Sequence, residues 1–344
     1  MRFAVRQPKT PDPSPSRPWA IWPALLAVYV IWGSTYLAIR FAVETLPPFL
    51  MAGVRFLLAG AVLYTWRRAR GDARPTAPEW RSAAIVGGFL LVGGNGAVVW
   101  AEQRIVSSVA ALLVSTVPLW MVLLDLLRPG GRRPGWRQIV GLLAGFAGVA
   151  TLVRPTQSAS PVGHTVGRVD LLGAAVLILG AFLWSIGSLY SRRAPLPASP
   201  LLATGMEMLA GGVGLLLLGT LSGEWGRLNP STFSARSLWG LVYLIVFGSW
   251  IAFTAYTWLL RVAPTPLVST YAYVNPLVAI LLGHLLDGDP LTLPTLLAAA
   301  VIVGSVALTT AAPPAPKPRV PRANLFRRRA AEPQGDAETV ATHR

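Results

Sequence analysis

The segment at residues 95–127, NGAVVWAEQRIVSSVAALLVSTVPLWMVLLDLL, has an echo 158 residues later, at residues 253–285. In this register seven of the 33 aligned residues are identical, and Pro118 aligns with Pro276. A second echo, at an offset of 152, aligns Trp32 with Trp184. Because the order of features is kept from one half to the other, we interpret the sequence as an internal duplication.

The composition is typical of an integral membrane protein. The 344 residues are 53% hydrophobic and 13% charged, whereas soluble domains are about one-quarter charged. Residues 105–124 contain no charge and are long enough to span a hydrocarbon core of roughly 30 Å as a helix. The absence of cysteine excludes disulfides and thiolate metal sites. We therefore expect a lipid bilayer around the protein.

The sequence predicts an all-α membrane protein with ten spans. The expected spans are residues 19–40, 47–66, 81–101, 105–127, 136–153, 169–191, 200–221, 237–260, 265–286 and 291–310. They divide into a first repeat at residues 19–154 and a second repeat at residues 168–310. The tails at residues 1–18 and 311–344 are rich in proline and arginine and are expected to be disordered.

The basic residues indicate the orientation. The net charge of +16 would suggest nucleic acid in a soluble protein, but here the basic residues fall in loops and tails, so no nucleic-acid partner is expected. With both termini in the cytoplasm, 23 basic residues lie inside and six outside, as the positive-inside rule requires. Each repeat then has an odd number of spans, so the two repeats have inverted topology, which is typical of carriers with a central site.

Three segments carry a family resemblance: IWGSTYLAIRFAVETLPPFLMAGVRFLLAG at residues 31–60, NGAVVWAEQRIVSSVAALLVSTVPLW at 95–120 and WLLRVAPTPLVSTYAYVNPLVAILLG at 258–283. They resemble the EamA-type branch of the drug/metabolite transporter (DMT) superfamily. The resemblance implies two five-helix repeats, both termini in the cytoplasm, and export of amino acids or other small metabolites. It also implies that the fifth and tenth helices lie at the periphery while the others surround a central cavity.

Charged residues inside spans are the first candidates for function, because each costs on the order of 2.5–3.5 kcal/mol at a helix centre. Glu207 and Glu102 are candidates for proton coupling; for both, a structural carboxyl is the alternative. Arg55 is the repeat counterpart of Glu207, and for it packing or pairing is the favoured interpretation over binding a substrate carboxylate. His284 is interpreted as a hydrogen-bonded packing residue.

Helix breaks and central polar or aromatic residues are the second kind of candidate. Pro118 and Pro276 are predicted to break matching spans, which in carriers points to the binding site. The candidates for the wall of a substrate cavity are Trp32, Ser34, Asn95, Thr116, Trp184, Tyr271 and Asn275. For the tryptophans, plain packing or lipid contact is the alternative, and for the prolines and Asn95 it is ordinary helix packing.

Gly141, Gly145 and Gly148 in the fifth span are typical of a close-packing face, which could serve a homodimer. The sequence has no metal-ligand histidine pair, no phosphate-binding glycine loop after a strand and no G-x-S-x-G elbow, so we expect neither an enzyme nor a cofactor or metal. The favoured function is a multi-pass exporter of small metabolites in the cytoplasmic membrane that works by alternating access, with proton coupling an open option. An uncoupled facilitator, an exporter of drugs or sugar derivatives, and a static membrane scaffold or receptor are the alternatives.

Overall fold

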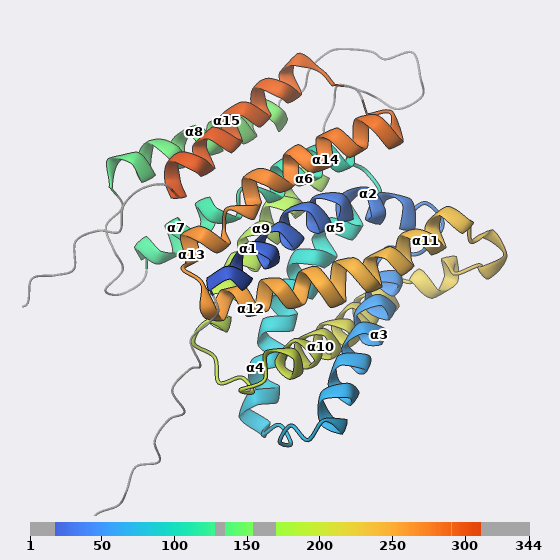
Figure 1. The fold of residues 1–344 in the computed structure, drawn as a ribbon. Helices are drawn as coiled ribbons and strands as arrows, with labels where there is room; N and C mark the ends of the chain where they lie inside the picture. The colour runs from blue at the N-terminus through green and yellow to red at the C-terminus, as the bar shows by residue number, and fades with distance from the viewer. Residues whose placement is uncertain (1–17, 128–134, 154–169, 290, 311–344) are drawn as a thin grey trace, which may run out of the picture. The chain divides into compact units, whose positions relative to one another are not determined.

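A computed structural model of the chain describes residues 18–127, 135–153, 170–289 and 291–310. Every regular element in these ranges is a helix, and all lie in the unit that ends at Ala312 (Figure 1). The predicted disordered tails fall outside the described residues, except for Pro18, which begins helix α1. The sides of the membrane on which the two termini lie therefore stay a prediction. The elements are α1 Pro18–Ala27, η1 Val28–Trp32, α2 Gly33–Ala42, α3 Pro48–Ala69, α4 Ala77–Gly87, η2 Gly88–Asn95, α5 Gly96–Ala101, α6 Ser107–Val114, α7 Val117–Leu127, α8 Trp136–Val153, α9 Leu171–Ser191, α10 Pro200–Leu221, η3 Glu224–Arg227, η4 Pro230–Thr232, α11 Ala235–Tyr243, η5 Leu244–Phe253, α12 Thr254–Val262, α13 Thr265–Val268, α14 Tyr271–Asp287 and α15 Leu293–Thr310.

Seven helices of the described chain are long and apolar enough to cross a membrane. They are Trp19–Ala42, Pro48–Ala69, Ala77–Ala101, Ser107–Leu127, Leu171–Ser191, Pro200–Leu221 and Ala235–Val262. Each coincides with one of the predicted spans to within a few residues. The other three predicted spans correspond to shorter apolar helices, so the count of ten stays a prediction.

Apolar stripes on the outer faces of these helices agree with a lipid environment. On α3, Val54, Leu58 and Val62 are exposed, and on α10 the same holds for Val213 and Leu217. Residues four apart lie on one face of a helix, so each set forms a continuous stripe. Water would penalise such stripes, whereas the tails of lipids match them.

Glycines bring the second span of each repeat into close contact. A methyl group on Gly60 of α3 would lie 2.8 Å from the carbonyl oxygen of Gly205 on α10. On Gly212 it would lie 2.9 Å from the backbone nitrogen of Leu57. Small residues at matching positions therefore let the two backbones approach each other, as in other membrane helix pairs. This contact joins the first repeat to the second.

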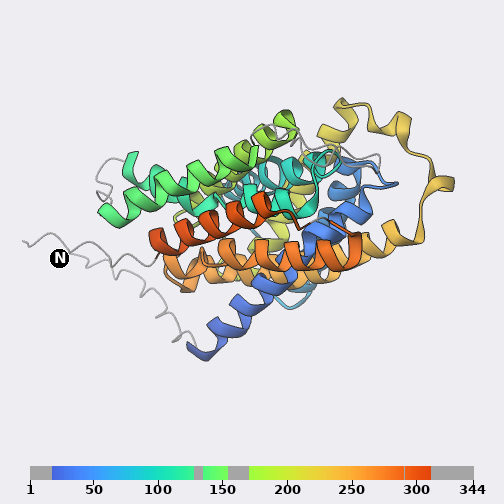
Figure 2. The ribbon, with the colours of Figure 1, turned by 90° about the horizontal axis from the view of Figure 1, so that it is seen from above.

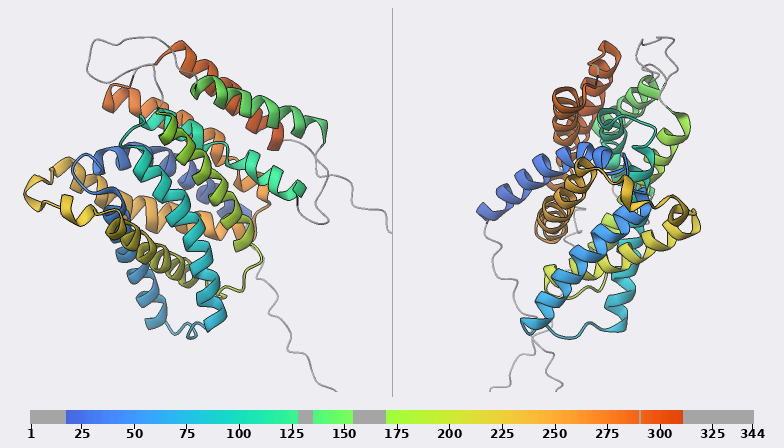
Figure 3. Two further views of the ribbon diagram at one scale, coloured as in Figure 1. Left: turned by 180° about the vertical axis from the view of Figure 1, so that it is seen from behind. Right: turned by 90° about the vertical axis from the view of Figure 1, so that its right-hand side faces the viewer.

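The helices α8 and α15 form a second pair, made of the fifth and tenth predicted spans. Figures 1 and 2 show them side by side, and Figure 3 shows the same pair from behind. A methyl group on Gly145 would lie 2.7 Å from Oγ of Ser305, and one on Gly148 would lie 2.9 Å from Cγ1 of Ile302. Two glycines of the predicted close-packing face thus meet α15 of the same chain. A homodimer stays a prediction.

The interruption near Pro118 lies where the sequence predicts it, and the one near Pro276 does not. Helix α6 ends at Val114 and α7 begins at Val117, so Pro118 is the second residue after the break. Pro276 instead lies inside α14, and the chain breaks earlier, between α13 and α14. The helix continues through Pro276, and the side-chain amide of the preceding Asn275 donates to the carbonyl oxygen of Tyr271 at 3.2 Å.

Candidate functional site

A cavity of about 70 Å³ lies between the two repeats. Its wall contains five of the seven residues predicted for a substrate cavity: Trp32, Asn95, Trp184, Tyr271 and Asn275. The first two come from the first repeat and the other three from the second. Residues about 240 positions apart in the chain are therefore brought to one space.

Trp32 is the centre of an aromatic cluster in the cavity wall. Its ring meets that of its repeat counterpart Trp184 edge-on, with centroids 5.5 Å apart and planes at 82°. Tyr271 lies 5.4 Å away, also edge-on, and Tyr256 lies 4.8 Å away. The Trp184 indole nitrogen donates to the Tyr256 hydroxyl at 3.1 Å. Edge-to-face pairs of this kind stabilise a fixed arrangement, so the cluster is a rigid apolar surface.

Three π-helical segments shape this wall, and the sequence analysis did not predict them. Trp32 ends η1, Asn95 ends η2 and Phe253 ends η5, and all three residues line the cavity. The register of 158 residues aligns Asn95 with Phe253, so η2 and η5 are repeat counterparts. π-Helical turns are frequent at functional sites because they widen the helix and alter its carbonyl pattern. The glycines around Asn95 were the available signal.

The two asparagines of the wall have different surroundings. The Asn275 amide donates to the carbonyl oxygens of Tyr271 and, at 3.0 Å, of Tyr29, so it ties α14 to η1. The Asn95 amide oxygen is buried and has no hydrogen-bond partner among the described residues. A buried acceptor without a donor is costly. Asn95 therefore presents an acceptor that a bound molecule can satisfy.

Ser34 and Thr116, the other two predicted cavity residues, lie outside the cavity wall. The Ser34 hydroxyl donates to the carbonyl oxygen of Ile31 at 2.7 Å and hydrogen-bonds the Tyr243 hydroxyl at 2.6 Å. The Thr116 hydroxyl donates to the carbonyl oxygen of Leu113 at 2.8 Å, at the break before α7. The Thr116 hydroxyl thus serves local helix bonding, whereas the Ser34 hydroxyl also joins α2 to α11.

Arg55 lines the cavity from α3 and is 2% exposed. Its Nε donates to Oγ of Ser249 at 2.9 Å, and its guanidinium carbon lies 4.5 Å from the centroid of the Phe56 ring. No carboxylate of the described residues pairs with it. The pairing considered at first for Arg55 is therefore not made within the described part of the chain.

Glu207 does not line the cavity. The residue is 2% exposed, and its Oε2 atom has no hydrogen-bond partner in the described chain. A methyl group on Gly87 of α4 would lie 2.4 Å from the Glu207 carbonyl oxygen. The backbone of α10 at Glu207 thus packs closely against α4.

Glu102, the residue after α5, is fully buried, and neither carboxyl oxygen has a hydrogen-bond partner among the described residues. Burial raises its pKa well above the ordinary value; Arg40 lowers it in part, whereas Asp289 and Asp287 raise it further. A buried carboxyl of this kind favours its protonated form. In the described ranges no group of three or more histidine, aspartate or glutamate side chains could hold a metal ion.

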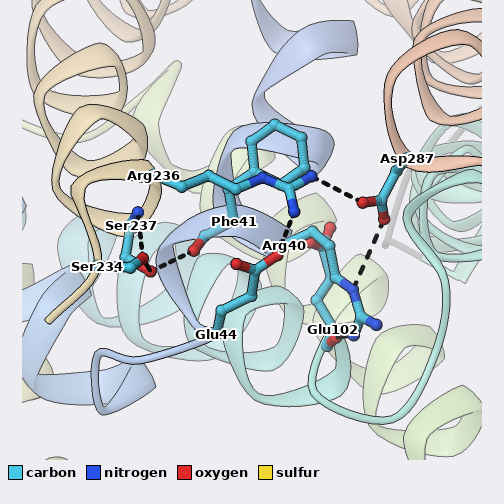
Figure 4. Close-up of polar contacts among 8 residues, drawn as sticks. All are labelled: Arg40, Phe41, Glu44, Glu102, Ser234, Arg236, Ser237 and Asp287. Atoms are coloured by element: carbon cyan, nitrogen blue, oxygen red, sulfur yellow. Dashed lines mark hydrogen bonds and ion pairs between the residues drawn. The ribbon is translucent and has the colours of Figure 1, made fainter. Parts of the chain in front are cut away.

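Ion pairs join three spans at the same end of the bundle as Glu102 (Figure 4). Arg236, in the first turn of α11, pairs with Glu44 at 3.1 Å and with Asp287 at 2.9 Å. Arg40 lies 3.9 Å from Asp287 and donates to the Glu102 carbonyl oxygen at 2.8 Å. We refer to Arg40, Glu44, Arg236 and Asp287 as the end cluster. Arg40 follows the cavity-lining residue Ile39 in α2, and none of the four residues of the end cluster lines the cavity itself.

The sequence is similar to transporters from several organisms. A model of the EamA-like transporter family matches residues 18–154 and 171–311, that is, both repeats. The chain is 40% identical over 288 residues to the uncharacterized inner membrane transporter YedA of Escherichia coli K12, covering 83% of this chain and 89% of that protein. It is 25% identical to the uncharacterized transporter YvbV of Bacillus subtilis, covering 83% of this chain and 90% of that protein.

More distant similarities cover most of the chain as well. A WAT1-related chloroplastic protein of Arabidopsis thaliana is 24% identical, covering 83% of this chain and 68% of that protein. One solved crystal structure superposes with a TM-score of 0.58 at 23% identity, covering 92% of this chain and all of that one. At this sequence identity the superposition supports a similarity of fold and nothing more.

Proposed function

Because this chain belongs to the EamA-like transporter family, we propose that it is a secondary transporter that exports small metabolites across the cytoplasmic membrane. Amino acids and related compounds are the proposed substrates. The observation that supports this proposal is the cavity, whose wall is shared by the two repeats through the contact between Trp32 and Trp184. A site between two repeats is what alternating access requires.

Alternating access needs one end of the cavity to be closed while the other is open. Among the described residues, the ion pairs that join different spans lie at the end of Glu102 and the end cluster. We assign the end cluster as the gate on that side. With inverted repeats and cytoplasmic termini, this side faces away from the cytoplasm. Opening it requires Arg236 to leave Glu44 and Asp287.

Proton coupling is part of the proposal, and Glu207 and Glu102 are its candidate groups. Both are buried carboxyl groups with an unsatisfied oxygen, and intramembrane carboxyl groups commonly mark proton pathways. Glu207 packs against α4 outside the cavity wall, and Glu102 accepts a hydrogen bond from Arg40 of the end cluster through its carbonyl oxygen. Protonation at either position would neutralise a buried carboxylate, and this would change the electrostatic free energy of the closed state.

Cysteine labelling tests alternating access directly. The natural chain has no cysteine, so Asn95→Cys is a single-cysteine variant without further changes. An impermeant thiol reagent is expected to label it from each side of oriented vesicles, and substrate is expected to slow both reactions. Labelling from one side only, whatever is added, would contradict alternating access and favour a static scaffold.

Transport itself is tested with proteoliposomes loaded with a mixed pool of amino acids and other small metabolites. We expect one class of compound to leave these proteoliposomes faster than it leaves equally loaded liposomes without protein. We also expect its release to respond to an imposed pH gradient. Specific release that ignores the gradient would show an uncoupled facilitator. Release of drugs or sugar derivatives in place of amino acids would replace the proposed substrate class.

A further inference from the structure

Arg55 places a positive charge in the wall of the cavity. Apart from Ser249, which accepts from Nε, and Phe56, which lies under the guanidinium plane, no described residue satisfies it. Its Nη1 atom is buried without a hydrogen-bond partner. A guanidinium group carries five N–H donors and no acceptor, so the donors of Nη1 lack an acceptor among the described residues around this wall.

The wall contains no group of opposite charge. All of its residues are apolar, aromatic or uncharged polar, with the single exception of Arg55. A buried charge without a partner is strongly unfavourable, and the apolar surroundings of a membrane protein strengthen this penalty. The electrostatic free energy of binding in the cavity therefore favours an anion next to Arg55 and disfavours a cation.

The aromatic cluster supplies the other half of the recognition. Phe56, which contacts the Arg55 guanidinium, lies 6.4 Å from Phe253, and Phe253 lies 6.4 Å from both Trp32 and Trp184. The charged and aromatic parts of the wall are thus continuous. Aromatic faces bind either cations or flat apolar groups; because Arg55 repels cations, these faces are left for an apolar group. The unsatisfied amide oxygen of Asn95 adds an acceptor for an N–H or O–H donor.

We propose that Arg55 is the anion-binding residue of the cavity and that the transported compound is a small organic carboxylate with a flat apolar body. The carboxylate accepts hydrogen bonds from the Arg55 guanidinium, and the body lies against Trp32, Trp184 and Phe253. This inference rests on the proposed transport function and names its substrate class. It reverses the packing interpretation that position in the sequence favours.

Three compounds that share one body and differ in charge test the proposal: 3-phenylpropionate, 3-phenylpropanamide and 3-phenylpropylamine. Binding is measured with purified protein in lipid nanodiscs, by the fluorescence of the cavity tryptophans and by the shift in melting temperature. We expect the carboxylate to bind roughly 10- to 100-fold more tightly than the amide, as charged hydrogen bonds allow, and the amine to bind most weakly.

The variants then assign this preference to one residue. Arg55→Gln is expected to reduce the affinity for the carboxylate to that for the amide. Arg55→Lys keeps the charge without the two-pronged geometry and is expected to retain part of the preference. The control is Arg104→Gln, because Arg104 is half-exposed, pairs with Asp170 and does not line the cavity; it should bind like the natural protein.

Several results would overturn the proposal. They are equal binding of the three compounds, no binding of the carboxylate to the natural protein, or a carboxylate preference that survives in Arg55→Gln. If Arg55→Gln does not fold, the comparison of the natural protein with Arg55→Lys decides in its place. Labelling of Asn95→Cys from both sides would meanwhile uphold the transport function, so the two failures are distinguishable.

Discussion

The helices α3 and α10 occupy equivalent places in the two repeats, yet the charges they carry meet different surroundings. An offset of 152 aligns Arg55 of α3 with Glu207 of α10. Arg55 lines the cavity, whereas Glu207 does not line it and its backbone packs against Gly87 of α4. Glycines set the close spacing of both helices, so the duplication gives the two repeats the same helix packing, which we call the common frame. What differs between the repeats is where polar groups are placed within that frame, and this difference makes the site asymmetric.

Breaking the common frame should have the largest effect. Gly60→Ala places a methyl group 2.8 Å from the carbonyl oxygen of Gly205 and 2.9 Å from the backbone nitrogen of Leu209. Backbone atoms cannot move aside as a flexible side chain can, so we expect a loss of about 1–3 kcal/mol, measured as a lower melting temperature in detergent. Gly88→Ala is the matched control, because a methyl group on Gly88 has nothing within 4 Å; an equal loss in both variants would contradict the role of close packing.

Variants of the two aligned charged residues, Glu207 and Arg55, should change different parameters of transport. Glu207→Gln is expected to lower gradient-driven transport by roughly tenfold, equivalent to about 1.4 kcal/mol, with substrate affinity unchanged. Arg55→Gln is expected to lower affinity whether or not a gradient is imposed. Initial rates in proteoliposomes over a range of substrate concentrations measure both quantities. Normal gradient dependence in Glu207→Gln would return this residue to a structural role.

The sequence predicts the all-helical fold and seven of its spans, because the apolar length of a span follows from the thickness of the membrane; the orientation inferred from the arginines stays a prediction. Five cavity residues, among them Trp32 and Trp184, were also identified, since polar and aromatic residues in mid-span positions are few. For Arg55 the sequence favours packing or pairing, because the alignment of the two repeats does not show whether its side chain meets an acidic partner in the fold. The π-helical segments depend on how neighbouring helices pack, and local sequence does not encode that directly.

Glu102 has no acidic counterpart in the other repeat, because the register of 158 residues aligns it with the buried residue Leu260. Because burial raises the pKa of Glu102, the native state binds its proton more tightly than the unfolded state does. This contribution to stability is complete below the ordinary carboxyl pKa and is lost as the pH rises through the raised pKa. Glu102→Gln cannot ionise, so its melting temperature should decline less between mildly acidic and alkaline pH. Parallel pH profiles of the two proteins would show that Glu102 does not titrate in this way.

The smallest effect is expected where the repeats begin. Helix α1 starts with Pro18, which has no backbone N–H to satisfy, whereas the Asp170 carboxylate caps α9 and accepts from the backbone nitrogens of Leu172 at 2.9 Å and Gly173 at 3.0 Å. Asp170→Ala should therefore cost about 1 kcal/mol. Asp170→Asn keeps an acceptor and should cost less.

The pH dependence separates this cap from a general loss of packing. The backbone N–H of Gly173 is the main cause of the lowered pKa of Asp170, and Arg104 adds to it. A lowered pKa means that the stabilisation is present above the ordinary carboxyl pKa and is lost as the pH falls through the lowered one. The melting temperatures of the natural protein and Asp170→Ala should therefore converge in acid and differ most at neutral pH. Arg104→Gln should change stability by less than about 1 kcal/mol, because the ion pair with Asp170 is partly exposed and leaves the two backbone hydrogen bonds of the cap intact.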